Sequence, residues 1–191
     1  MQSAPASVAI PGYLAGTWKA DPVHSEIVFS VRHLMLSKVR GRFTGYDVTI
    51  VTGGDPLDSS ATATIDLASV DTGHEVRDNH LRSSDFFEVE TYPTMSYRST
   101  GISRTDDGWL VDGDLTLHGV TRHVPLAVEL NGFRPDPWGG QRAGFSATAR
   151  IDRRDFGIGP TIPMDGGGFA LGDKVSIMIE IQAVLQDQPS P

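Results

Sequence analysis

Polar and apolar residues alternate along most of this chain, which is the pattern of strands with one buried face. The clearest case runs from Trp109 to Leu130, where apolar residues occupy most alternate positions on both sides of His118–Gly119. A short gap containing Gly between two alternating segments is typical of a β-hairpin turn. The sequence therefore predicts a hairpin with one apolar face and one face, bearing Asp114 and Glu129, that lies in water.

The same alternation predicts further strands before and after this hairpin. The first is short, at Gly16–Ala20, and the most regular is the last, at Lys174–Leu185, where every odd position is apolar. The others are expected at 24–33, 39–51, 60–67, 94–100 and 143–151. Gly41 and Gly45 indicate bulges that curl the strand at 39–51.

One segment departs from the alternation. His74–Ser83 has apolar residues at helical spacing and no internal Gly or Pro, so it is predicted to form a short helix. Asp71 or Thr72 is expected to cap its first turn. This is the one helix that the sequence predicts.

The predicted elements indicate an all-β fold of about eight strands in one antiparallel barrel with one short helix. A closed barrel removes exposed strand edges, and a ring of about eight strands is either filled by its side chains or holds one small ligand. Small residues expected to face inward favour a ligand: Ala61, Ala63, Gly113, Ala147 and Ala149. We divide the chain into a tail at 1–12, a barrel domain at 13–186 and a second tail at 187–191.

Composition and charge narrow the function. Sixteen basic and 24 acidic residues give a net charge of −8 without a basic stripe, so nucleic acid is not an expected partner. No uninterrupted apolar run of about 18 residues occurs, so stable membrane insertion is not expected. The chain has no cysteine, which excludes a thiolate nucleophile and a cysteine zinc site. Its N-terminus has no secretory pattern, from which we expect a cytoplasmic protein.

The polar motifs give no catalytic assignment. The six histidines match no familiar zinc spacing, so no metal or other cofactor is expected, and hydrogen-bonded side chains at the barrel rims are the ordinary interpretation. No Gly-x-Ser-x-Gly motif occurs, and we assign no enzymatic activity. Opposite charges in Asp152–Asp155 fit a rim salt-bridge network, or an Arg that meets a pyrophosphate. Asp165–Gly168 is interpreted as a flap at the pore mouth.

Four segments together resemble the YceI-like family of lipocalin-like lipid-binding proteins. These are Thr17–Ser25 with Phe29–His33, His80–Phe87 with Tyr92–Pro93, Gly113–Arg122, and Arg150–Gly157. The resemblance implies a lipocalin-type antiparallel barrel with a long apolar pore. It also implies a polyisoprenoid ligand, either a prenyl pyrophosphate or an isoprenoid quinone, that the protein would bind, sequester or transport.

Site residues are assigned by their character, since ligand pockets are mostly apolar with a few polar groups. The expected wall or lid residues are Phe29, Val31, Phe43, Phe86, Phe87, Tyr92, Leu115, Leu117, Phe145 and Phe169. The expected head-group residues are Arg32, His118, Arg122 and Arg154. Plain core packing is the ordinary interpretation of any single aromatic residue.

Two alternatives to a lipid-binding barrel stay open. One is an enzyme that acts on a bound isoprenoid, because a fold does not fix a function. The other is a self-associating stress-response barrel with a filled core. We also consider that two copies of this chain assemble as a homodimer.

Overall fold

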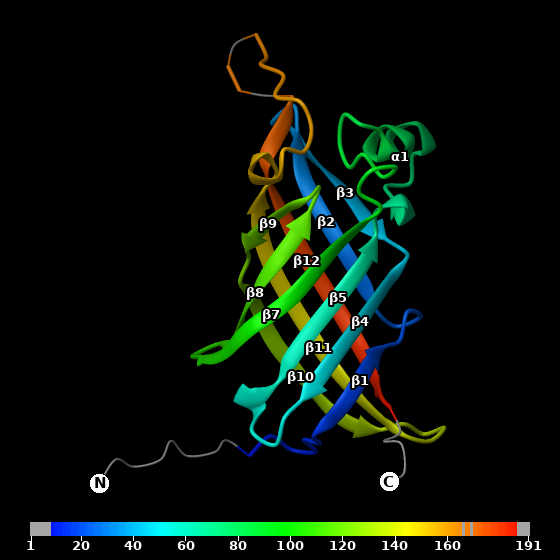
Figure 1. Ribbon diagram of the computed structural model, residues 1–191, viewed down its shortest axis with the longest axis vertical. Helices are drawn as coiled ribbons and strands as arrows, with labels where there is room; N and C mark the ends of the chain where they lie inside the picture. Colours follow the sequence, from blue (N-terminus) through cyan, green and yellow to red (C-terminus); the bar gives the residue numbers. More distant parts are fainter. Residues whose placement is uncertain (1–8, 166, 169, 187–191) are drawn as a thin grey trace, which may run out of the picture.

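The computed structural model describes residues 9–165, 167–168 and 170–186. Strands form a barrel with one short helix at one end (Figure 1). The strands are β1 Gly16–Ala20, β2 Glu26–His33, β3 Ser37–Phe43, β4 Tyr46–Thr52, β5 Ser60–Asp66, β6 Val70–Asp71, β7 Thr94–Thr105, β8 Gly108–Leu117, β9 Val120–His123, β10 Leu126–Pro135, β11 Gln141–Asp152 and β12 Leu171–Leu185. The helix is α1 Glu75–Arg82, and the 3₁₀ turns are η1 Pro56–Asp58, η2 Leu67–Ser69 and η3 Arg153–Phe156. Phe169, Gly166 of the predicted flap, and residues 1–8 and 187–191 of the predicted tails lie outside the described residues.

Eight strands close the barrel. They pair in the order β1, β4, β5, β7, β8, β10, β11 and β12, and β12 returns to β1 through the pairs Trp18 with Leu185 and Ala20 with Ala183. At the other end of β12, β2 takes the place of β1 and continues the wall through β3 to the short β6. The pairs are antiparallel, so the predicted antiparallel barrel with a single short helix is confirmed.

The segment predicted as one strand at 39–51 is interrupted. β3 ends at Phe43 and β4 begins at Tyr46, with Gly45 in the gap between them. Gly41 lies in an unbroken ladder opposite Phe29, so the bulge predicted there is wrong. The glycine serves a packing purpose instead, because a Cβ atom at this position would come 2.4 Å from Cζ of the Phe29 ring.

The turn predicted at His118–Gly119 is confirmed, but the strand after it is divided. The backbone angle φ is 53° at His118 and 71° at Gly119, as a type I′ hairpin turn requires. β9 pairs with β8 directly after the turn, and β10 begins only at Leu126. Pro125 stands between them and has no amide hydrogen for a strand ladder.

The cap of α1 differs from the prediction. The N-cap is His74, whose Nδ1 accepts a hydrogen bond from the amide of Arg77, so the assignment to Asp71 or Thr72 is wrong. Thr72 donates hydrogen bonds from its amide and its hydroxyl to the buried carboxylate of Asp78 within the helix, which fixes the chain just before α1.

In the described part of the chain, no helical segment has the length and apolar character needed to cross a bilayer.

The two ends of the barrel are built differently. We call the end that carries α1 and η3 the cap end, and the opposite end the base (Figure 1). At the base, Trp18 is fully buried and donates its indole N–H to the Thr52 hydroxyl at 2.8 Å. Phe133 packs edge-on against both Trp18 and Tyr13. These aromatic rings pack against one another in the core near the base.

An ion-pair cluster joins the strands at the base. Arg142 of β11 donates to Asp21, between β1 and β2, at 2.8 Å, and also pairs with Asp136. Hydrogen bonds from His24 and from Arg142 lower the pKa of Asp21 to about 2. The Asp21 side chain is largely buried, so these bonds are partly shielded from water.

We predict that Asp21→Asn lowers the free energy of unfolding at pH 7 by about 1–2 kcal/mol. A carboxyl group with a lowered pKa stabilises the folded state above its unfolded value of 3.8 and loses that contribution as the pH falls toward 2. Urea denaturation at several pH values should therefore show the two proteins converging between pH 4 and pH 2. Asp47→Asn is the control, because Asp47 pairs with Lys19 in an exposed position. Equal losses in both variants would contradict the assignment.

Candidate functional site

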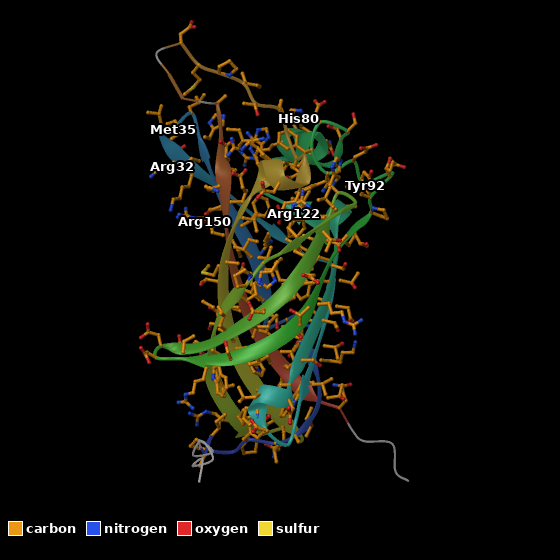
Figure 2. The ribbon with its side chains drawn as sticks, turned by 60° about the vertical axis from the view of Figure 1, so that its left-hand side comes forward. Arg32, Met35, His80, Tyr92, Arg122 and Arg150 are labelled. Carbon is orange, nitrogen blue, oxygen red and sulfur yellow. The ribbon has the colours of Figure 1, made fainter. Side chains whose placement is uncertain are left out.

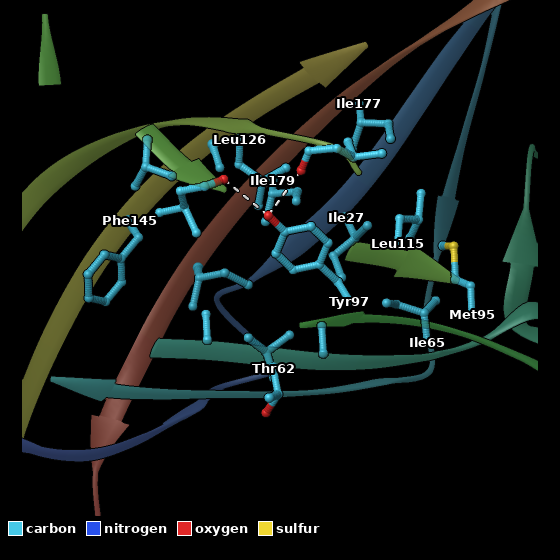
Figure 3. A pocket seen from close by; sticks show the side chains of 18 of the residues that line it. Ile27, Thr62, Ile65, Met95, Tyr97, Leu115, Leu126, Phe145, Ile177 and Ile179 are labelled. Carbon is cyan, nitrogen blue, oxygen red and sulfur yellow. Dashed lines mark hydrogen bonds between the residues drawn. The ribbon is translucent and has the colours of Figure 1, made fainter. Parts of the chain in front are cut away.

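An apolar cavity of about 310 Å³ lies inside the barrel (Figure 3). Its lining runs from Ile10 and Pro56 at the base to Leu81 and Leu171 at the cap end. The inward faces of the strands supply most of this lining, as their alternation requires. The centre of the barrel is therefore not filled by its own side chains.

Small inward residues account for part of this space. Ala61, Ala63 and Ala147 line the cavity, where larger side chains would occupy it. Gly113 has another role, because a Cβ atom there would come 2.3 Å from the hydroxyl oxygen of Tyr97. Gly113 thus makes room for a tyrosine ring rather than for a ligand.

Tyr97 is the main polar group in the middle of the cavity (Figure 3). Its hydroxyl lies 3.1 Å from each of two carbonyl oxygens, those of Val111 and Val124, which share its single proton. Burial raises the pKa of Tyr97, and Asp112 and Asp114 raise it further, so the phenol stays neutral. The sequence analysis missed Tyr97, although it shares the inward parity of the strand predicted at 94–100.

Arg153 of η3 is the one charged side chain that lines the cavity among the described residues. It is only 3% exposed. Its guanidinium donates to the carbonyl oxygens of 158–159, Leu171 and Gly172 and to the carboxylate of Asp173. These partners engage all five guanidinium N–H groups. Arg153 therefore holds the cap loops to β12 and has no free donor to offer a ligand.

Eight of the ten predicted wall residues line the cavity. They are Phe29, Val31, Phe43, Phe86, Phe87, Leu115, Leu117 and Phe145. Tyr92 is not among the lining residues, because its ring packs against Gly119 and lies 4.6 Å from the His118 ring. Phe169 lies outside the described residues. That any of them contacts a ligand stays a prediction.

The predicted head-group residues Arg32, His118, Arg122 and Arg154 do not line the cavity. Arg32 is exposed on β2, and Arg122 is exposed and donates to the carbonyl of Thr121. His118 bridges the carbonyl of Phe156 in η3 and the carboxylate of Glu88, at 3.1 and 3.3 Å. It thereby joins the β8–β9 turn to η3 and to the loop after α1.

Arg154 belongs to a salt-bridge network, as one interpretation of Asp152–Asp155 predicted. It pairs with Asp152 at 2.7 Å and with Asp173 at 3.3 Å, and Lys174 also reaches Asp152. The hydrogen bond from Arg154 holds the pKa of Asp152 well below its usual range. The positive charge of Arg154 is thus directed to neighbouring carboxylates rather than to the cavity.

The chemistry open to this cavity is the burial of hydrocarbon. Within the described residues, no His, Asp, Glu, Lys or Cys lines it, so the lining has no general acid or base of these types. In that same part of the chain, no cluster of three or more potential metal ligands is found. The lining can exclude water from an apolar molecule and shape the space around it.

Comparisons with known proteins agree with this architecture. The family model described as the YceI-like domain matches residues 18–183. The YceI protein of Escherichia coli is 40% identical over 148 residues, covering 76% of this chain and 78% of the relative. The crystal structure of the Campylobacter jejuni YCEI protein aligns with a TM-score of 0.68 at 30% identity, over 82% of this chain and 90% of that one. A polyisoprenoid-binding domain from Saccharophagus degradans aligns with a TM-score of 0.63 at 19% identity, over 91% of this chain and all of that domain, and this likeness concerns the fold alone.

We predict that two alanines of β11 respond differently to enlargement. Both face inward, but Ala147 lines the cavity, whereas Ala143 is 1% exposed in the packed core near the base and does not line it. Ala143→Leu should lower the free energy of unfolding by about 1–3 kcal/mol through overpacking. Ala147→Leu should change it by less than about 1 kcal/mol, because the side chain enters empty space. Equal losses in chemical denaturation would show that no void exists at Ala147.

Proposed function

Because this chain belongs to the YceI-like family, we propose that its barrel binds a polyisoprenoid lipid, with the hydrocarbon tail inside the cavity. The observation that carries the proposal is the continuous apolar lining from base to cap end. Burial of hydrocarbon contributes about 25 cal/mol per Å² before the costs of association. Several isoprene units therefore suffice for binding without any polar contact.

The likeness to the Saccharophagus degradans domain supports the class of ligand. That domain is described as polyisoprenoid-binding, and it shares the fold of this chain over its whole length. A barrel of this kind serves to sequester or transport the lipid, since enclosure removes the tail from water. The absence of titratable groups other than Tyr97 and Tyr13 and of charges other than Arg153 along the described lining fits binding better than catalysis.

The saturation of Arg153, the one charged side chain in the described lining, favours a lipid with an uncharged head group inside the cavity, such as an isoprenoid quinone. A pyrophosphate drawn into the cavity would need cations, and Arg153 is already saturated by protein partners. Taking Arg153 away from these carbonyl groups would leave buried acceptors without donors. A prenyl pyrophosphate is therefore accommodated only with its head outside the cavity.

We predict that purified protein carries or takes up an isoprenoid and that filling the cavity prevents this. Ala147→Phe places a ring in the cavity and should weaken isoprenoid binding by at least about ten-fold. Native mass spectrometry with lipid extraction, followed by titration with an isoprenoid quinone, measures the effect. The same spectra report whether the chain is a monomer or the homodimer considered above.

The matched control is Ala127→Phe, the same substitution at an exposed position of β10. It should leave lipid binding unchanged, since its side chain points away from the cavity. Undiminished binding by Ala147→Phe, or equal loss in both variants, would show that the lipid does not lie inside the barrel.

We also predict that the protein prefers an isoprenoid quinone to a prenyl diphosphate of equal tail length, by about ten-fold or more. The basis is the cost of desolvating a charged head that finds no free cation inside the cavity. Competition between the two lipids for a fluorescent isoprenoid measures the ratio. Tighter binding of the diphosphate would overturn the assignment of the head group and leave the assignment of the tail intact.

A further inference from the structure

The turn between β2 and β3 exposes three consecutive large apolar side chains. Leu34 is 41% exposed, Met35 is 51% exposed and Leu36 is 84% exposed. Single exposed apolar residues are ordinary, but three in succession at the tip of a hairpin form a protruding apolar surface. We call Leu34–Leu36 the tip.

The tip also has an unfavourable backbone conformation. The angle φ is 50° at Leu34 and 58° at Met35, and the amide of Leu36 donates to the carbonyl of His33 at 3.0 Å. A turn with two left-handed central residues strongly prefers Asn and Gly, because side chains such as Leu and Met crowd the backbone there. The chain thus keeps apolar side chains at the tip at a cost in stability, which is typical of functional positions.

The tip adjoins the loop of the cap end and the cavity. The amide of Leu34 donates to the carbonyl of Ala170 at 2.8 Å, and the amide of Ala170 donates to the carbonyl of Ile162 at 2.9 Å. Ile162 is itself 51% exposed and extends the apolar surface. His33, just before the tip, pairs with Leu171, which lines the cavity. The exposed surface therefore lies beside the end of the cavity that η3 covers.

Basic side chains flank the tip on the outer wall. Arg32 faces Lys38 across β2 and β3, and the pairings Arg40 with Ser30, Ser30 with Ser176 and Ser176 with Arg150 place two more arginines in one row. In Figure 2, Arg32, Met35 and Arg150 lie toward the same end and side of the molecule. Within the described residues, Arg32, Lys38, Arg40 and Arg150 form no salt bridge and no side-chain hydrogen bond.

This local excess of positive charge contrasts with the net charge of −8 for the whole chain. Small Ser30 and Ser176 side chains leave an open groove between Arg40 and Arg150. A phosphate group on a surface could lie in such a groove, since guanidinium groups bind phosphate oxygens in pairs. The basic face and the apolar tip thus offer both contacts that an anionic lipid surface provides.

We propose that the cap end docks reversibly on an anionic lipid bilayer, with Leu34–Leu36 inserted among the head groups and the four basic residues against the phosphates. An apolar segment beside basic residues is the combination that holds a protein at such an interface. A narrow tip suits a soft bilayer better than a protein partner, because stable protein interfaces bury about 800 Å² on each side. This proposal rests on the proposed function, because docking serves a purpose only if the barrel binds an isoprenoid. It places the exchange of that isoprenoid at a membrane.

The test replaces the tip by residues that its backbone prefers. The double variant Leu34→Asn with Met35→Gly should fold with an unchanged or higher unfolding midpoint, because it relieves the strained turn. It should bind vesicles of phosphatidylglycerol and phosphatidylcholine at least about ten-fold more weakly than the unmodified chain. Vesicle flotation measures binding. If the turn has only a structural role, the double variant should bind vesicles as strongly as the unmodified chain does.

The charges and the position are tested separately. Arg40→Gln with Arg150→Gln should weaken binding to the same vesicles by about 10- to 30-fold, at about 1 kcal/mol for each basic residue. Trp138→Ser is the control, because Trp138 is 92% exposed in the turn between β10 and β11 at the base. This variant should bind as the unmodified chain does. Equal loss in Trp138→Ser, or equal binding to pure phosphatidylcholine vesicles, would overturn the proposal.

Uptake of a short-chain isoprenoid from solution separates this proposal from the function on which it rests. The tip and arginine variants should retain uptake while losing vesicle binding. If the unmodified chain takes up the isoprenoid but does not bind anionic vesicles, the docking proposal is refuted and the lipid-binding barrel stands. The exposed surface would then be a candidate site for a protein partner. Vesicle binding without uptake would refute the isoprenoid function itself.

Discussion

Closure of the sheet through β12 is the interaction on which the rest of this structure depends. β12 pairs with β11 along most of its length, with β1 through its last residues and with β2 through its earlier ones. This arrangement fixes which side of every strand faces inward, because a shift of one residue would turn each side chain to the opposite face. The apolar parity of β12, from Val175 to Leu185, thus becomes the wall of an enclosed space.

The shape of that space follows from the sizes of the inward residues. Near the base, Trp18 and Phe133 pack against each other in the core, whereas the small side chains of Ala61, Ala63 and Ala147 line the cavity and leave it open. Tyr97 occupies the middle because Gly113 gives room for its ring. Arg153 ties the cap loops to β12 and keeps its charge among protein acceptors. The cavity is therefore apolar along its length, and its polar groups are committed to the fold.

Alternation of polar and apolar residues was enough to predict the barrel and the hairpin at His118–Gly119, and helical spacing was enough to predict the helix near 74–83. Most of the residues chosen as walls for their apolar character line the cavity, and their contact with a ligand stays a prediction. Interruptions of the ladders were harder to predict. Gly45 lies in the break between β3 and β4, but Gly41 stays within β3 and makes room for Phe29. Only the partner across the sheet distinguishes these two glycines.

Contacts made in the folded structure also determine which charged residues are buried and which are exposed. Arg153 and Arg154 are adjacent in sequence, yet one is buried against the cavity and the other is exposed among carboxylates. The direction of each side chain depends on η3, a turn that alternation does not reveal. The exposed tip was not predicted from the sequence for a related reason. Leu34 and Met35 occupy a turn conformation that their side chains disfavour, so no turn is expected at these residues.

Anomalous diffraction from crystals grown with an isoprenoid quinone that carries bromine in its tail tests the central claim most directly. The account predicts a bromine peak inside the barrel, among residues such as Leu115, Phe145 and Ile179 (Figure 3). A peak on the outer wall, or a barrel interior occupied by its own side chains with no density for the tail, would contradict it.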